Sequence, residues 1–236
     1  MSVDTSDLVV TLTEDNDVSQ LTLAGPDGEL VAEQSVSPGV TTIRLPILDM
    51  EAGVSGYEHY TPGVQTLTVS YGEETAQMDV PLEPGLQVTD VQQYRGEESP
   101  TALGNIVVSI ENTGTGPTWI YDIIYSNAPY SAANKELSEG AGIPLLQQPD
   151  SPTSAIITPE QEQQYRGSTP PLLFPEDEFD SCKRQTVSFQ IQIGIATGDH
   201  ITRALKAELG GDKKLDSGIG HVTCSSSDIR LVEEEV

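Results

Sequence analysis

The sequence predicts an all-β protein that is built from two β-sandwich domains in tandem. Short runs in which apolar and polar residues alternate recur along most of the 236 residues. Turn-forming residues separate these runs at intervals of about 8–12 residues, which is typical of short antiparallel strands. No long stretch with the 3.6-residue period of a helix separates them, so βαβ units are not expected.

The first domain is expected over residues 1–84, as a series of short strands. Residues 7–12 alternate in polarity and form the first clear strand. Pro26-Asp27-Gly28 lies between two further alternating runs and predicts a hairpin. Pro38-Gly39 leads into another strand, and Gly72-Glu73-Glu74 connects the last two.

The second domain is expected over residues 85–236, because Pro84-Gly85 interrupts the strand pattern and a new alternation begins at Leu86. Its plainest strand is "QTVSFQIQIGIATG", residues 185–198. Five apolar residues alternate there with small or polar ones: Val187, Phe189, Ile191, Ile193 and Ile195.

The segment "GNIVVSIENTGTGPTWIYDI", residues 104–123, predicts two strands joined by a glycine-rich turn. We expect the glycines of residues 111–116 to supply positive φ angles. The second strand then begins at Pro117 and places Trp119, Tyr121 and Ile123 on one face. A tryptophan on the third strand is the central core residue of immunoglobulin-like sandwiches, which makes Trp119 the expected core marker of the second domain.

Tyr60 is the corresponding marker of the first domain. The run from Tyr60 to Gly63 is similar to the corner before a late strand of immunoglobulin-like domains, where a tyrosine bonds nearby backbone. Tyr57, His59 and Tyr60 are therefore interpreted as corner and core residues, in preference to a binding site. Both domains are predicted to be immunoglobulin-like.

Two stretches of the second domain resemble CARDB-like immunoglobulin modules of archaeal and bacterial surfaces. "VVSIENTGTGP" is similar to their strand–turn–strand segment, and "IITPEQEQQYRGS" to a later strand. The resemblance covers part of the domain and implies a fold without an activity. It is interrupted by a long loop insertion at residues 126–155, and a loop of that length in a compact domain is usually functional or a contact arm.

The composition is strongly acidic, with 37 Asp and Glu against 11 Lys and Arg and a net charge of −26. Such charge favours disorder in a chain that lacks apolar runs, but the alternating strands argue against disorder here. Adaptation to molar salt, which screens surface carboxylates, fits better. The pattern resembles proteins of haloarchaea and their viruses. Nucleic-acid binding is not expected, because no basic stripe is present.

The N-terminal stretch "MSVDTSDLVVTLTEDND" lacks the basic and apolar segments of a secretory signal peptide. No window approaches the roughly 18 apolar residues that cross a bilayer, so no membrane insertion is expected. We therefore expect synthesis and assembly in the host cytoplasm.

No catalytic or cofactor motif is found, so we expect a protein that is not an enzyme and takes no cofactor or metal. The three histidines, His59, His200 and His221, are far apart in sequence. The densest acidic run, "PEDEFDS", lies at residues 175–181 and lacks the spacing of an EF-hand. It is interpreted as a solvated loop in preference to a calcium site.

The two cysteines, Cys182 and Cys224, are candidates for a disulfide if the ends of their strands are neighbours. Two buried thiols are the equal alternative, because synthesis in a cytosol favours reduced cysteines. The pentapeptide "QQYRG" occurs at residues 92–96 and again at 163–167. We interpret this as chance, with a pair of equivalent Arg contacts to a partner as the alternative.

The function expected from these features is a non-enzymatic structural protein of a halophilic archaeal virus particle, a capsid turret or decoration protein. Its expected location is the virion. The expected partners are other virion proteins, namely the major capsid protein or tail and portal components, and further copies of itself in a cyclic homo-oligomer. Residues 126–155 and 175–181 are the candidate contacts. The alternatives are a haloarchaeal cell-surface adhesion or binding module and an enzyme on a β-sandwich scaffold.

Overall fold

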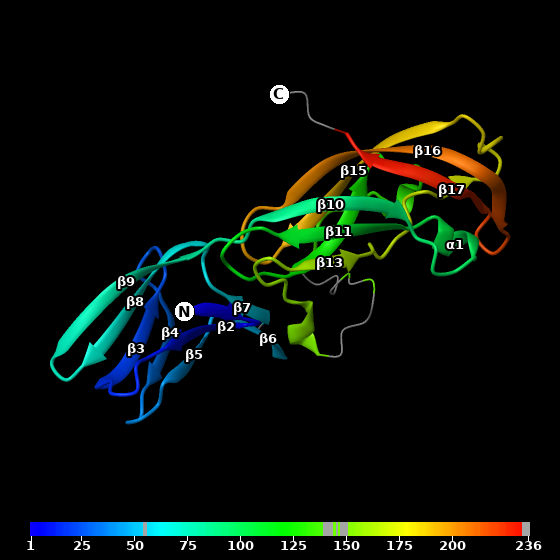
Figure 1. The fold of residues 1–236 in the computed structure, drawn as a ribbon. Coiled ribbons are helices and arrows are strands. Elements are labelled where there is room, and N and C mark those ends of the chain that lie inside the picture. The colour runs from blue at the N-terminus through cyan, green and yellow to red at the C-terminus, as the bar shows by residue number, and fades with distance from the viewer. Residues whose placement is uncertain (54–55, 139–143, 145, 147–150, 233–236) are drawn as a thin grey trace.

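The computed structural model describes residues 1–236 except 54–55, 139–143, 145, 147–150 and 233–236, and leaves the side chains of residues 51–58 undescribed. Antiparallel strands make up nearly all of the regular structure in these described residues, so the predicted all-β class is confirmed. The strands form an elongated molecule, with the β8–β9 turn at one end and helix α1 near the other (Figure 1).

Residues 1–84, the N-terminal region, form two facing sheets and a separate hairpin. One sheet has the order β1-β2-β5: Ser2–Asp4, Asp7–Thr11 and Thr42–Pro46. The facing sheet has the order β4-β3-β8-β9: Leu30–Ser35, Val18–Ala24, Gly63–Tyr71 and Glu74–Leu82. The hairpin consists of β6 (Leu48–Gly53) and β7 (Gly56–His59).

Along these strands, more buried and less buried side chains alternate as the sequence predicts. Leu8, Leu21 and Leu67 are almost completely buried, while their sequence neighbours are less so. The predicted turn at Pro26-Asp27-Gly28 joins β3 to β4, and Gly28 has a positive φ of 80° that glycine tolerates. These sheets enclose the first hydrophobic cluster, called here the N-terminal core.

Residues 85–236, the C-terminal region, also form two facing sheets. The smaller sheet has the order β10-β11-β13: Leu86–Gln93, Ile106–Asn112 and Glu162–Tyr165. The larger sheet has the order β12-β15-β16-β17-β14: Ile120–Ser126, Thr186–Ile195, Ile201–Asp216, His221–Leu231 and Phe174–Pro175. Helix α1 (Pro100–Leu103) and two 3-10 turns, η1 (Ser131–Ala133) and η2 (Pro152–Ala155), complete the regular elements of the described chain.

The C-terminal core lies between these two sheets. The predicted strand at residues 185–198 is found as β15, whose Phe189, Ile191 and Ile193 are buried. From the facing sheet, Ile106, Val108 and Ile110 of β11 are fully buried. Burial of this many large aliphatic side chains, at about 1.5–3 kcal/mol each, is the main stabilisation of the region.

The strand predicted to start at Pro117 differs from the observed one. Strand β12 begins at Ile120, and a bulge lies between Ile120 and Asp122 in its pairing with β15. A bulge adds one residue to one strand and shifts the side-chain alternation. Trp119 and Tyr121 consequently pack on the N-terminal core, whereas Ile123 packs in the C-terminal core. The expectation that Trp119 is the centre of the second sandwich is therefore wrong.

The insertion at residues 126–155 lies partly outside the described residues, at 139–143, 145 and 147–150. Its described ends are packed into the protein. Ala128 and Ala133 belong to the C-terminal core, and Ala155 belongs to the N-terminal core. The insertion therefore begins on one core and ends on the other.

Candidate functional site

The N-terminal core contains side chains from beyond residue 84. Trp119, Ala155 and Ile156 are at most 2% exposed and pack with the aliphatic side chains of the first two sheets. The C-terminal core contains no described residue from before Leu86. The contact between the two regions is thus part of a hydrophobic core, and this junction is the candidate functional site.

Tyr60 joins the two regions by a hydrogen bond. Its ring is buried in the N-terminal core, and its hydroxyl donates to the backbone oxygen of Pro117 over 2.8 Å. Burial raises the pKa of this hydroxyl well above the usual value for tyrosine, and a hydrogen bond with Thr197 opposes that shift. Tyr60 was expected to bond nearby backbone, but its partner lies 57 residues away in the other region.

A second set of hydrogen bonds fixes the chain where it passes between the regions. We call residues 111–116 the junction turn and residues 83–85 the linker. Six bonds connect them: Thr113 N and Thr113 Oγ1 to Gly85 O (2.8 Å each), Thr115 N to Glu83 O (2.7 Å), Gly116 N to Glu83 O (3.1 Å), Glu83 N to Thr115 Oγ1 (3.1 Å) and Gly85 N to Asn112 Oδ1 (3.1 Å). Glu83 and Gly85, the two ends of the linker, are thus both fixed to the junction turn.

Asn112 stands at the centre of this arrangement and is completely buried. Its Oδ1 accepts bonds from the N–H groups of Gly85 and Gly114, at 3.1 and 3.0 Å. Its Nδ2 donates to the carbonyls of Gly116 and Ile157, at 2.8 and 3.0 Å. Both donor hydrogens and both acceptor sites of the amide are used, which is the full capacity of this side chain.

The glycines of the junction turn allow the linker to pass close to the turn. They were expected to adopt positive φ angles, and they do not. Gly114 and Gly116 are absent from the residues with positive φ in the described chain. A Cβ atom on Gly114 would collide with the backbone of Glu83 and Gly85, and one on Gly116 with the hydroxyl of Tyr60. Glycine is needed here because the linker passes directly against the turn.

Trp119 lies on the side of the junction that faces β7. The ring of His59 meets it edge to face, with 6.1 Å between ring centroids. The backbone of Trp119 accepts a bond from Ala196 N at 3.0 Å, and Thr118 next to it pairs with Ile157. His59 is itself exposed, and the side chain of Tyr57 is not among the described ones.

Two clefts open near the junction. The first, of about 490 Å³, has His59 and Tyr60 in its wall together with Glu29 and Asp49. The second, of about 400 Å³, lies between the linker and Thr197 to Asp199. The described residues hold no group of three or more His, Cys, Asp or Glu side chains placed to bind a metal ion.

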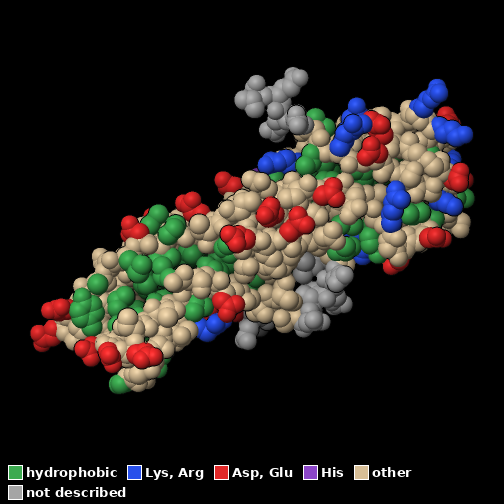
Figure 2. All heavy atoms as spheres, viewed as in Figure 1, with side chains coloured by type: hydrophobic (Ala, Val, Ile, Leu, Met, Phe, Trp, Pro, Cys, Tyr) green, Lys and Arg blue, Asp and Glu red, His purple; other side chains and the backbone are tan. Residues whose placement is uncertain are grey.

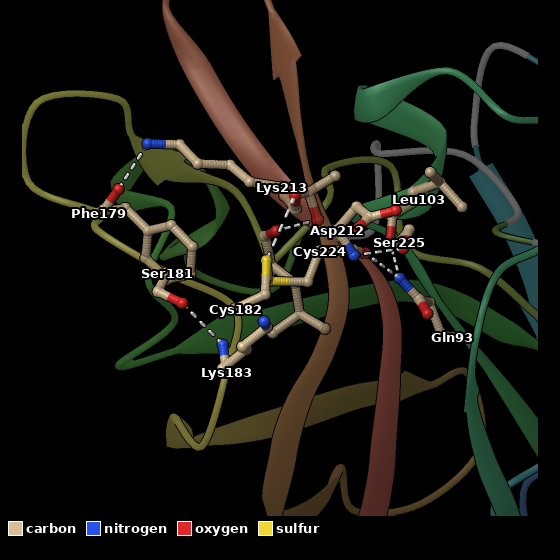
Figure 3. Close-up of a disulfide and its surroundings, with 12 residues drawn as sticks. Gln93, Leu103, Phe179, Ser181, Cys182, Lys183, Asp212, Lys213, Cys224 and Ser225 are labelled. Carbon is tan, nitrogen blue, oxygen red and sulfur yellow. Dashed lines mark hydrogen bonds between the residues drawn. A yellow bond between two sulfur atoms is a disulfide. The ribbon is translucent and has the colours of Figure 1, made fainter.

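At the far end of the C-terminal region, Cys182 and Cys224 form a disulfide (Figure 3). The bond ties the loop after β14 to strand β17. Gln93 reaches the same place from β10, and its Nε2 donates to the carbonyls of Leu103 and Cys224 at 2.8 and 2.9 Å. Of the two alternatives left open by the sequence, the structure contains the disulfide.

The acidic segment 175–181 is anchored beside this disulfide. Phe179 is buried and stacks on Phe174 at 4.2 Å between ring centroids. The Nζ of Lys213 donates to the carbonyl of Phe179 at 2.6 Å. The carboxylates on either side of Phe179 are exposed. The segment is thus held by the buried Phe179 and by hydrogen bonds to Lys213 and Gly220, with its acidic groups in solvent.

The two "QQYRG" stretches lie on either side of β11. The first ends β10 and the second ends β13, and both strands pair with β11. The guanidinium of Arg166 lies over the ring of Tyr94, 4.6 Å from its centroid. Their surroundings differ, because Tyr165 is fully buried and Tyr94 is not. Nothing in the sequence around either stretch predicts this contact between them.

Comparison with known proteins adds little to this description. No protein-family model and no curated protein matches the chain. One solved structure, a crystal structure of a Salmonella alpha-2-macroglobulin mutant, aligns over 99% of this chain and 16% of its own. Its sequence is 11% identical and its TM-score is 0.20, which is too low to establish a shared fold. Among the described residues, no helix has the length and apolar character needed to span a membrane.

Proposed function

We propose that this chain is a non-enzymatic structural protein of a halophilic archaeal virus particle, acting as a turret or decoration protein of the capsid. In this proposal its two regions are tandem immunoglobulin-like sandwiches that serve as a spacer. The observation that carries the proposal is the junction, where Tyr60 and Glu83 bond across the boundary to Pro117 and the junction turn, and Trp119 completes the other region's core. A spacer that projects from a surface needs such a fixed connection.

The charge distribution supports a halophilic setting. Residues 1–84 carry 15 Asp and Glu and a single cation, Arg44, which is paired with Asp4 and Asp7. The remaining residues carry 22 Asp and Glu and 10 Lys and Arg. Self-repulsion of this kind destabilises a compact state in dilute buffer and is screened at molar salt, where the Debye length is about 3 Å.

The proposed partners are other virion proteins, such as the major capsid protein or tail and portal components, and copies of the same chain in a cyclic homo-oligomer. Segments 126–155 and 175–181 are the proposed contacts. The first ends on the N-terminal core, and the second is an exposed loop at the opposite end of the molecule. The described ends of the first segment are anchored to the two cores by Ala128, Ala133 and Ala155, and the second segment is anchored by Phe179.

The test is density-gradient fractionation of the native source in molar salt, with this protein followed by mass spectrometry. We expect it to sediment with DNA-filled particles at a constant ratio to the major shell protein. Its copy number relative to that protein then gives the oligomer, trimeric or pentameric. Recovery only with the cell envelope, or only as free protein, would overturn the proposal.

A second candidate function, a haloarchaeal cell-surface adhesion or binding module, is favoured by the disulfide between Cys182 and Cys224. Disulfides form and persist mainly outside the cytosol. The fractionation separates the two functions when it is combined with thiol labelling of each fraction. An adhesion module is expected in the envelope fraction and oxidised, whereas a virion protein is expected in the particles.

A further inference from the structure

Strand β9 has an unpaired edge. The order of its sheet is β4-β3-β8-β9, so β9 pairs with β8 and with no other described strand. An unpaired edge presents a row of backbone donors and acceptors that a further strand can use. β9 is nine residues long, enough for several such bonds.

The direction of these groups follows from Pro81, which pairs with Val64 of β8. In an antiparallel ladder, alternate residues direct both backbone groups to the same side. Proline has no N–H to give to β8, so Pro81 belongs to the set directed away from it. Thr75, Gln77 and Asp79 share that set, and their N–H and C=O groups therefore point outward from the sheet edge.

The inner face of β9 is also uncovered. Met78 pairs with the fully buried Leu67, so the two side chains lie on the same face, yet Met78 is 47% exposed. All residues from Glu74 to Asp79 are exposed. The facing sheet has three strands against four in the sheet that contains β9, and its edge strand β1 has only three residues.

The surroundings of this edge are acidic. The β8–β9 hairpin carries Glu73, Glu74 and Asp79, and the loop between β2 and β3 carries three more carboxylates. On the face drawn in Figure 2, hydrophobic side chains are exposed over this region with carboxylates around them, and no cationic side chain is seen at that end. The one cation of the region, Arg44, is paired elsewhere.

We propose that β9 is an acceptor edge for an extended, cationic segment of a partner protein, which adds to the sheet as a further strand. Its backbone pairs with Thr75, Gln77 and Asp79. Its apolar side chains, at alternate positions, cover Met78 and Ala76, and its Lys or Arg side chains face the carboxylates. The same carboxylates oppose pairing of two β9 edges from two copies, because like charges would then lie side by side.

The probe is a labelled nine-residue peptide, acetyl-KVTVKVTVK-amide, added to the full chain at the lowest salt at which circular dichroism shows it folded. We expect saturable binding by fluorescence anisotropy. Amide hydrogen exchange should slow at Thr75, Gln77 and Asp79 and remain unchanged along β4, the other edge of the sheet. The same peptide with alternate backbone nitrogens methylated keeps its charge but cannot pair, so its binding should be lost.

Two charge variants separate edge pairing from general attraction. Asp79→Lys lies on the edge, and Asp27→Lys, at the β3–β4 hairpin, changes the net charge equally. We expect about tenfold weaker binding in the first, in line with about 1.4 kcal/mol, and little change in the second. Equal losses in both variants, or equal binding of the methylated peptide, would overturn the proposal. So would protection of the three amides by protein concentration alone, which would indicate pairing of two copies.

Discussion

The two regions of the molecule complete their cores in different ways. The C-terminal core is built from its own residues and is closed by a disulfide. The N-terminal core takes Trp119, Ala155 and Ile156 from the other region and has no covalent cross-link. The N-terminal region also has a much larger excess of carboxylates over cations for its length. Among the described residues, the N-terminal core therefore includes side chains of the C-terminal region, whereas the C-terminal core includes none of the N-terminal region.

Separating the regions is the most severe test of this asymmetry. A chain of residues 85–236 should fold cooperatively in molar salt, because the described C-terminal core lies entirely within it. A chain of residues 1–84 should not, since it lacks Trp119, Ala155 and Ile156. Circular dichroism during urea titration measures both. Cooperative unfolding of the isolated 1–84 chain would contradict the asymmetry.

Trp119→Ala should destabilise the N-terminal region by about 3–5 kcal/mol, the usual cost of removing a large aromatic side chain from a core. Although the substituted residue belongs to the C-terminal region, that region should be affected less. Hydrogen exchange with mass spectrometry reports on each region separately. Phe189→Ala, in the C-terminal core, is the matched control. It should destabilise the C-terminal region more than the N-terminal region.

Removing the disulfide by Cys182→Ala together with Cys224→Ala should destabilise only the C-terminal region, by about 2–4 kcal/mol. The covalent bond closes a loop with a sequence separation of 42 residues, and its loss increases the conformational entropy of the unfolded chain. Urea titration with and without reductant checks this value. An equal loss in the N-terminal region would show that the two regions unfold as a single unit.

Alkaline pH should weaken both regions. Burial raises the pKa of Tyr60, Tyr125 and Tyr165 above the usual value near 10. Above about pH 10 the unfolded chain loses these protons while the folded chain keeps them, so stability falls as pH rises, by up to about 1.4 kcal/mol per pH unit for each group. Two of the three tyrosines lie in the C-terminal core, which should lose more.

Urea titrations between pH 9 and 11 measure this slope. Tyr165→Phe removes one of the contributing groups and should make the slope shallower, while leaving the loss in the N-terminal region unchanged. An unchanged slope in this variant would mean that Tyr165 does not hold its proton in the folded state as inferred.

The strands and tight turns could be predicted from the sequence. They depend on the local alternation of apolar and polar residues and on glycine or proline at particular positions. The predicted runs at residues 7–12 and 185–198 and the turn at Pro26-Asp27-Gly28 are examples. The core position of Trp119 could not be predicted, because it depends on a bulge in the pairing of β12 with β15. A shift of one residue in register reverses which core a side chain enters.

The role of Asn112 was missed for a related reason. In the sequence it is one of several turn-forming residues, and nothing local distinguishes it from Thr113 or Thr115. Its importance comes from the linker, which approaches from 27 residues earlier in the chain. Similarly, the spacing of Cys182 and Cys224 permitted a bond, but only the pairing of the surrounding strands brings them together.

The disulfide also has a mechanical consequence, which matters for the proposed role as a projecting spacer. Tension applied to the two ends of the chain would pass from Cys182 to Cys224 through the covalent bond, so β15 and β16 between them would carry none of it. At about 3.4 Å per residue, the oxidised chain would extend roughly 140 Å less than the reduced chain when pulled out fully. Under load, the segment between the two cysteines would therefore keep its length even after the sheets around it had been drawn apart.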